Sequence, residues 1–142
     1  MSASRRLLPG ALLSAVLAGC NIFGNGAASP TFPQHEGFGL SGPSGGTVGT
    51  LVVHQGCLMF APDEAGTRTM IIWPTDFAPL PDGTGVQGDG HVLLVGDEVE
   101  FGGGEYTDEA WVMERLVGPP MALECRIGRY VLVTSVMGQP ER

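Results

Sequence analysis

The sequence predicts a mostly β fold: a small antiparallel barrel of five or six strands with one short helix, with a small two-sheet sandwich as the alternative. Short runs rich in β-branched and apolar residues recur along the chain, and turn signals separate them every few residues. A single stretch has helical periodicity. With 43% hydrophobic residues, the chain has enough apolar side chains to build a core.

The first three strands are expected to form an antiparallel meander. Thr50–His54 is apolar and β-branched, and Gln55-Gly56 is a tight-turn signal that leads into Cys57–Ala61. Asp63–Gly66 is a second turn signal, and Thr67–Trp73 follows it. Short connections of this kind join antiparallel neighbours.

Residues 75–90 are expected to form a long loop, because they contain Pro79, Pro81 and several glycines. A loop of that length inside a small domain is either functional or mobile. The sheet resumes at His91–Val95. In Glu98–Phe101 carboxylates alternate with apolar residues, so the period of two places Val99 and Phe101 in the core and the two glutamates in water.

The last part of the domain contains a glycine run, a helix and a strand. Gly102–Gly104 is expected to be a bulge, a sharp bend or a close backbone approach. Asp108–Val117 is the helix candidate, with Thr107 or Asp108 as its cap and Gly118 followed by two prolines as its end. Arg129–Val136 is the final strand.

Taken together, these elements favour a barrel of the OB-like or SH3-like kind. A helix in an OB-fold usually lies between the third and fourth strands, whereas the helix candidate here comes just before the last strand. The order of the strands is therefore left open.

The N-terminus has the form of an export signal. Arg5 and Arg6 precede an apolar run, and the run closes in Leu17-Ala18-Gly19-Cys20. This segment resembles the lipobox of bacterial lipoproteins. The resemblance implies that residues 1–19 are a signal peptide, that Cys20 carries a diacylglyceryl group, and that the protein is anchored to a membrane of the cell envelope on its extracytoplasmic side.

The segment has two alternative interpretations, a membrane-spanning helix and a twin-arginine signal. The apolar run is shorter than the roughly 18 residues that a membrane-spanning helix needs, and Pro9, Gly10 and Ser14 interrupt it. Ser4–Leu8 partly resembles a twin-arginine export signal, so the export route stays open. A second acyl chain on the new amino group would make the anchor stable, since one chain binds membranes only reversibly.

Residues 21–46 are expected to be a flexible tether, because Gly, Pro and Ser make up 13 of these 26 positions. Phe32, His35 and Phe38 lie in it and are expected to be solvated. The sequence thus predicts a lipidated Cys20 with its tether over 20–46, a domain over 47–138 and a disordered tail over 139–142.

Two cysteines remain once Cys20 is assigned to lipid. In an exported protein, Cys57 and Cys125 are expected to form a disulfide. They lie 68 positions apart, and closing a loop of that length stabilises a fold by roughly 4 kcal/mol in the chain-entropy treatment. A free thiol or a metal ligand is the alternative.

The charge of the chain argues against a nucleic-acid partner. The chain has 15 acidic and 7 basic side chains, and loss of residues 1–19 would remove two of the arginines. Lysine is absent, so no basic face is expected that could neutralise phosphates. The membrane is the expected partner, through the lipid on Cys20, and an envelope protein or a polysaccharide is a further possible partner.

One candidate binding rim combines Trp73 with Gly102, Gly103 and Gly104, because aromatic side chains on loops at the end of a barrel often supply binding affinity. The alternative is that Trp73 belongs to the core. Two Gly-x-Gly-x-x-Gly matches, at Gly37–Gly42 and Gly83–Gly88, lack the flanking strand and helix of a dinucleotide site.

The function predicted is that of a non-catalytic binding or structural module, with no catalytic residue, cofactor or metal. The alternative is a small hydrolase or divalent-cation-binding domain that uses acidic residues around loop 75–90, such as Asp82 and Asp89. Acidic residues beside glycine also form turns in their own right. His54 and His91, at the ends of predicted strands, are weaker candidates for zinc or copper.

Overall fold

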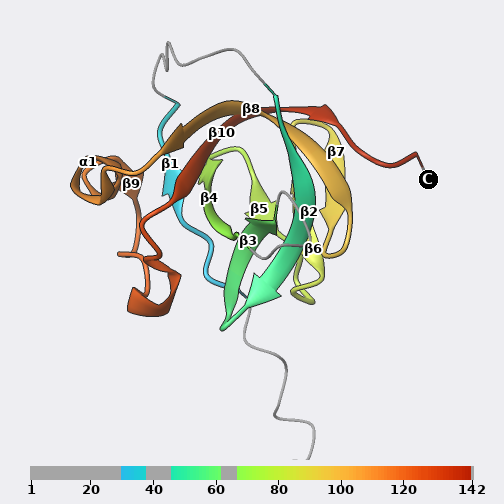
Figure 1. Ribbon diagram of the computed structural model, residues 1–142. Coiled ribbons are helices and arrows are strands. Elements are labelled where there is room, and N and C mark those ends of the chain that lie inside the picture. Colours follow the sequence, from blue (N-terminus) through green and yellow to red (C-terminus); the bar gives the residue numbers. More distant parts are fainter. Residues whose placement is uncertain (1–29, 38–45, 62–66, 142) are drawn as a thin grey trace, which may run out of the picture.

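The computed structural model describes residues 30–37, 46–61 and 67–141. This part of the chain is mostly β and contains one seven-stranded sheet, one three-stranded sheet and very little helix (Figure 1). The segment Leu17–Cys20 lies outside these residues. No helix in the described ranges is long and apolar enough to cross a membrane.

Three strands in the middle of the large sheet form the predicted meander. β2 (Thr47–His54), β3 (Cys57–Ala61) and β4 (Thr69–Pro74) pair in antiparallel order. Gln55 and Gly56 both have positive φ, 51° and 75°, which is the conformation of a two-residue hairpin turn whose twist matches that of its strands. The tight turn predicted at these two residues is therefore confirmed.

Two long strands complete the pairing around this meander. β8 (Glu98–Tyr106) is antiparallel to β2 and to β10 (Tyr130–Gly138). β10 also pairs with β4 in parallel register, with Tyr130 opposite Met70. Each of β2, β3, β4, β8 and β10 thus has two neighbours within this group of five strands.

Several of these strands are buried on both faces, because their alternate side chains enter two separate apolar clusters. Along β3, Leu58 and Phe60 belong to the first cluster, whereas Cys57 and Met59 belong to the second. β4 and β10 alternate in the same way. Strands buried on both sides have continuous apolar runs rather than alternating ones, and such a run occurs in β3.

Residues 75–90, predicted as a long loop, instead contain two strands of the small sheet. β5 (Ala78–Pro79), β6 (Gly85–Gly88) and β7 (His91–Leu94) form an antiparallel meander. The turn between β6 and β7 is Asp89-Gly90, and both residues have positive φ as in a two-residue hairpin. The glycines that suggested a loop form turns and close strand contacts instead.

The predicted tether is wrong for residues 30–37. β1 (Gln34–His35) pairs with β4 in parallel and with β9 (Leu116–Val117) in antiparallel order. The Gln34 side-chain amide donates to the Phe77 carbonyl at 2.7 Å, and His35, which is 1% exposed, places Nε2 2.8 Å from the Val133 carbonyl oxygen. These contacts anchor the segment despite its proline and glycine content, so the domain does not begin at residue 47.

Residues 107–129, which join β8 to β10, form what we call the α1 lobe. It contains α1 (Glu109–Met113), β9 and a 3₁₀ helix, η1 (Leu123–Cys125), and it projects to one side of the strands (Figure 1). Asp108 is the helix cap, as predicted, with its side chain accepting a hydrogen bond from the Trp111 backbone. The helix is shorter than the predicted 108–117, because Leu116 has already entered β9.

A disulfide between Cys57 and Cys125 ties this lobe to the start of β3, and the pairing predicted from the sequence is present. The Cα atoms of the two cysteines are 5.6 Å apart, and both residues are fully buried. At the other end of the chain, residues 139–141 follow β10 without helix or strand.

Candidate functional site

Trp73, the aromatic residue of the predicted binding rim, is fully buried in the first apolar cluster. Phe32 stacks on its ring with centroids 5.4 Å apart, and Phe101 meets it edge-on at 5.5 Å. Phe77 lies 5.4 Å away on another side. An indole enclosed in this way supports the core and presents no exposed surface to a ligand, so the rim prediction is wrong for Trp73.

The three glycines of the predicted rim lie inside β8 and face β10. Gly103 has a φ of 139°, and a Cβ placed there would lie 2.0 Å from the carbonyl oxygen of Leu132. The register between the two strands shifts between Val133 and Ser135, opposite Gly102 and Gly103. The close backbone approach predicted for this run is therefore confirmed at Gly103, whereas the extra residue at the register shift is Thr134 of β10. The glycines serve strand pairing rather than a loop at the rim.

The acidic residues around 75–90 do not converge with His91. Asp82 lies in the turn before β6, whereas Asp89 and His91 lie at the other end of that strand. Four residues of strand correspond to about 13 Å. The convergence that a cation site or an acid–base pair requires is thus not formed by these three residues.

The Asp82 carboxylate takes part in turn formation. Its Oδ1 accepts hydrogen bonds from the Thr84 hydroxyl at 2.6 Å and from the Thr84 backbone at 3.0 Å. These two bonds lower the pKa of Asp82 below its usual value, the side-chain bond contributing most. Asp97 likewise accepts from the Leu94 backbone at 2.7 Å. Both carboxylates follow the turn chemistry that the sequence suggested as the alternative.

The two histidines considered as metal ligands lie in different sheets. His54 ends β2 opposite Cys57, and His91 begins β7 opposite Gly88. Within residues 30–37, 46–61 and 67–141, no group of three His, Cys, Asp or Glu side chains is placed to hold a metal ion.

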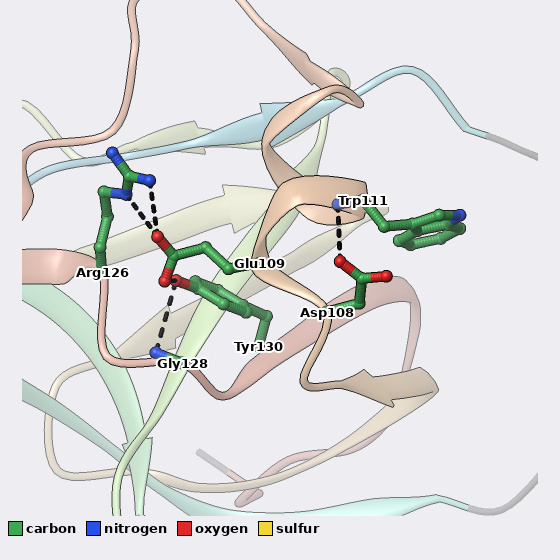
Figure 2. A network of polar contacts seen from close by, with 6 residues as sticks. All are labelled: Asp108, Glu109, Trp111, Arg126, Gly128 and Tyr130. Carbon is green, nitrogen blue, oxygen red and sulfur yellow. Dashed lines mark hydrogen bonds and ion pairs between the residues drawn. The ribbon is translucent and has the colours of Figure 1, made fainter.

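The most connected polar group lies at the base of the α1 lobe (Figure 2). Glu109, in the first turn of α1, accepts a hydrogen bond from the Tyr130 hydroxyl at 2.7 Å and one from Arg126 Nε at 2.8 Å. A second guanidinium nitrogen of Arg126 lies 2.6 Å from the same carboxylate. The Gly128 backbone N–H donates to the Tyr130 hydroxyl at 3.4 Å. Three segments of the chain therefore meet at one carboxylate.

The hydrogen bonds of this group shift the pKa of Glu109 and of Tyr130 in opposite directions. Burial raises the pKa of Tyr130 to about 12, and its hydrogen bond to Glu109 acts in the same direction. The bonds from Tyr130 and then from Arg126 lower the pKa of Glu109. These contacts join α1 of the lobe to Tyr130 at the start of β10.

An aromatic stack covers another part of the lobe. The rings of Tyr106 and Trp111 are nearly parallel, with centroids 4.6 Å apart, and the Arg115 guanidinium lies 3.5 Å from the centroid of the Trp111 ring. Tyr106 in turn lies over Gly104, since a Cβ on that glycine would be 3.0 Å from its ring. Arg115, Tyr106 and Gly104 therefore occupy ring faces of this stack on which a sugar would otherwise bind.

The outer end of the lobe is apolar and hollowed. One pocket of about 340 Å³ and one of about 290 Å³ share Pro120 and Met121 in their linings. The first is also lined by Met113 and Arg126, and the second by Phe32. Neither pocket contains a carboxylate, a histidine or a thiol, so the lining suits contact with apolar groups better than catalysis.

Sequence reasoning did not find the Glu109–Arg126–Tyr130 group. These residues are 17 and 21 positions apart, and no periodic pattern connects them. The available signal was Glu109 directly after a helix cap, which is also what an ordinary helix start contains.

Comparison of the chain with protein-family models, with curated proteins and with solved structures gives no match.

Proposed function

We propose that this protein is a lipoprotein of the bacterial cell envelope, anchored through Cys20, and that its β domain is a non-catalytic binding or structural module. The observation that carries the proposal is the buried Cys57–Cys125 disulfide. Disulfides of this kind persist in oxidising, exported environments and are rare in the cytosol. The disulfide agrees with the export signal that Leu17–Cys20 resembles.

We further propose that the five strands that each have two neighbours in this group form a small barrel of the OB type. In chain order, strands one to five of this barrel are β2, β3, β4, β8 and β10. β2 pairs with β3, β3 with β4, β4 with β10, β10 with β8, and β8 with β2, which gives the order 1-2-3-5-4-1. The parallel pair is the third strand with the fifth. This strand order agrees with an OB-fold, which is a five-stranded barrel with Greek-key connections. In place of a helix, the small sheet β5–β7 occupies the connection from the third strand to the fourth.

The α1 lobe covers the sheet face that OB domains use for ligands. That face is formed by the second and third strands and bordered by the loop between the fourth and fifth. Here the outward side chains of β3 and β4, such as Met59 and Ile72, pack against Val112, Met121 and Cys125 of the lobe. This packing argues against an oligonucleotide or a sugar on that face and leaves the exposed surface of the lobe for contacts.

The proposal is tested by intact-mass measurement of the mature protein, with and without reduction. We expect a mass that corresponds to cleavage before Cys20 plus lipid, and a gain of two hydrogen atoms on reduction. The Cys20→Ser variant is the matched control: it should lose the lipid mass and the membrane association but keep the gain on reduction. An unmodified Cys20 in the native host, or a chain that remains in the cytosol, would refute the proposed anchor.

A further inference from the structure

The chain segment that leads from Cys20 joins the domain beside the disulfide. The backbone N–H of Thr31 donates to the Gly56 carbonyl at 2.7 Å, and Thr31 is bridged to Cys57 in parallel register. Cys57 is bonded to Cys125 of the α1 lobe. The N-terminal attachment point and the outer end of the lobe are therefore neighbours, while the C-terminus lies on the opposite side of the molecule (Figure 1).

This attachment point limits how far the domain can be from a membrane. Residues 30–37 belong to the domain, so ten positions separate Cys20 from Pro30, in place of the 26 of the predicted tether. A chain of ten residues spans at most about 36 Å in any conformation. A domain of roughly this size has a radius of gyration of about 13 Å, so the limit is close to the width of the domain itself.

Apolar side chains are exposed next to this point. Leu123 and Ile127, on either side of Cys125, are 76% and 39% exposed. Pro119 and Pro120 are exposed as well and border the two pockets of the lobe. We call these four residues the apolar end of the lobe. An apolar group beside the point where a lipid-anchored segment joins its domain suits the headgroup–acyl boundary of a bilayer.

The distribution of charge favours the same orientation. Three of the four arginines in the described ranges, Arg115, Arg126 and Arg129, lie in the lobe or at its end, and residues 107–129 contain four carboxylates. The rest of the described chain has nine carboxylates and a single arginine, Arg68. The lobe is thus nearly neutral, whereas the remainder of the domain would be repelled by anionic lipids.

We infer that the apolar end of the lobe rests on the surface of the bilayer and orients the domain, with Leu123 and Ile127 in the headgroup region. The inference depends on the proposed lipidation of Cys20, because two partly exposed side chains alone would not hold a protein on a membrane. It adds a second, oriented contact to the lipid anchor, and it turns the acidic surface away from the membrane.

Fluorescence quenching by nitroxide-labelled lipids tests this orientation. The lipidated chain carries Trp111→Phe, which leaves the buried Trp73 as a constant background, and then either Leu123→Trp or Met137→Trp as reporter. Met137 is 57% exposed and lies close to the C-terminus, so it is a matched control away from the lobe. Both variants are reconstituted in vesicles of phosphatidylethanolamine and phosphatidylglycerol with a headgroup nitroxide, and their thermal midpoints are checked against that of the parent.

We expect a larger fractional loss of emission from the Leu123→Trp variant than from the Met137→Trp variant. Equal losses, or none, in a protein whose mass shows lipid on Cys20 would overturn the orientation and leave the anchor intact. Absence of lipid from Cys20 would overturn the proposed function, and this inference with it. An emission change at Leu123→Trp that follows protein concentration and not the nitroxide would indicate a second copy at this surface and would also overturn the inference.

Discussion

At the scale of single residues, the hydroxyl of Tyr130 connects the first strand residue of β10 to the helix of the lobe. It donates to Glu109 and accepts from the Gly128 backbone, so both its donor and its acceptor capacity are used. A buried hydroxyl with these partners favours the protonated form of the phenol, because an anion beside Glu109 would be repelled and poorly solvated. The energetic contribution of Tyr130 therefore depends on pH.

Stability should fall at alkaline pH because of Tyr130. Its pKa is about 12 in the folded protein and about 10 in the unfolded chain, so the unfolded chain loses the proton first. The stabilisation is complete below pH about 10 and is lost as pH rises towards about 12. Denaturant midpoints measured from neutral to alkaline pH should show this decline.

The Tyr130→Phe variant is the control for that decline. It should be less stable than the parent at neutral pH, because Glu109 loses a donor, but its midpoint should change less between pH about 10 and about 12. Tyr106 is present in both proteins and cancels in the comparison, and the chain contains no lysine. Parallel alkaline profiles for the two proteins would contradict the assignment.

Gly103 is the glycine for which substitution should cost most. Its φ of 139° is rarely adopted by other residues, and a Cβ would collide with the Leu132 carbonyl oxygen. We expect Gly103→Ala to lower the free energy of unfolding by about 2 kcal/mol or more. Gly37→Ala, where nothing lies within 4 Å of the added Cβ, should change it by less than about 0.5 kcal/mol. Equal denaturant midpoints for the two variants would rule out the close approach.

Which residue-scale features could be predicted depends on how local their causes are. The burial of Val99 and Phe101 follows from strand alternation, and the cap at Asp108 follows from the residue type and its position. The burial of Trp73 depends on Phe32, 41 positions earlier, which stacks on it. No local pattern indicates that a distant segment will cover an aromatic ring.

At the scale of elements, the α1 lobe is held by three kinds of contact: the disulfide, the Glu109 group and the packing of its apolar residues on β3 and β4. The helix itself has five residues and would not persist alone in water, since isolated helices shorter than about 12 residues are marginal. The lobe is therefore held in place by tertiary contacts. Among them, the disulfide stabilises the fold by lowering the conformational entropy of the unfolded chain.

Removal of the disulfide should loosen this lobe before the rest of the domain. Cys57→Ser with Cys125→Ser should lower the free energy of unfolding by about 4 kcal/mol, because the bond closes a loop of 68 positions. Trypsin should then cut first at Arg115 or Arg126, within the lobe. Denaturant unfolding and limited proteolysis with mass analysis measure the two effects.

The Cys20→Ser variant, which keeps the disulfide, is the control for this experiment and should match the parent in both measurements. A doubly substituted protein that is as stable as the parent and is cut elsewhere would show that the lobe is held by its packing alone.

Elements were predictable where short-range signals set them. The meander β2–β4 follows from its turn residues, and Asp89-Gly90 in fact carries the same hairpin signal, although the surrounding prolines and glycines suggested a loop. β1 could not be predicted, because it has two residues and exists through pairing with β4 and β9. The composition of residues 30–37 predicted a tether, whereas pairing of β1 with β4 and β9 joins this segment to the sheet.

At the scale of the whole molecule, residues 30–37 complete the core from outside the predicted domain. Phe32 covers Trp73, and Pro33 and His35 are buried. Without residues 30–37, one side of the first apolar cluster would be exposed to water, since they cover β4, which is buried on both faces.

A chain that begins at Phe38 should therefore be less stable than one that begins at Pro30. Loss of the half-buried Phe32 and the buried His35, with their contacts, should lower the free energy of unfolding by roughly 3 kcal/mol, which is the size expected for removing a large side chain from the core. In a Trp111→Phe background, the emission of Trp73 should also shift to longer wavelength as water reaches it. Equal midpoints and equal emission would restore the interpretation of these residues as a tether.

The parallel pairing of β4 with β10 has a consequence for how the protein is made. Tyr130 lies opposite Met70, and Cys125 is bonded to Cys57, so contacts separated by 60 or more positions are needed before the pairing of the large sheet is complete. Non-local pairing of this kind slows folding, because the entropy of loop closure is lost before the contacts form. A chain that crosses a membrane from its N-terminus would leave the edges of β4 and β8 that pair with β10 uncovered until its last strand arrives. Folding would then be completed only after nearly the whole chain had crossed, with oxidation of the two cysteines among the final steps.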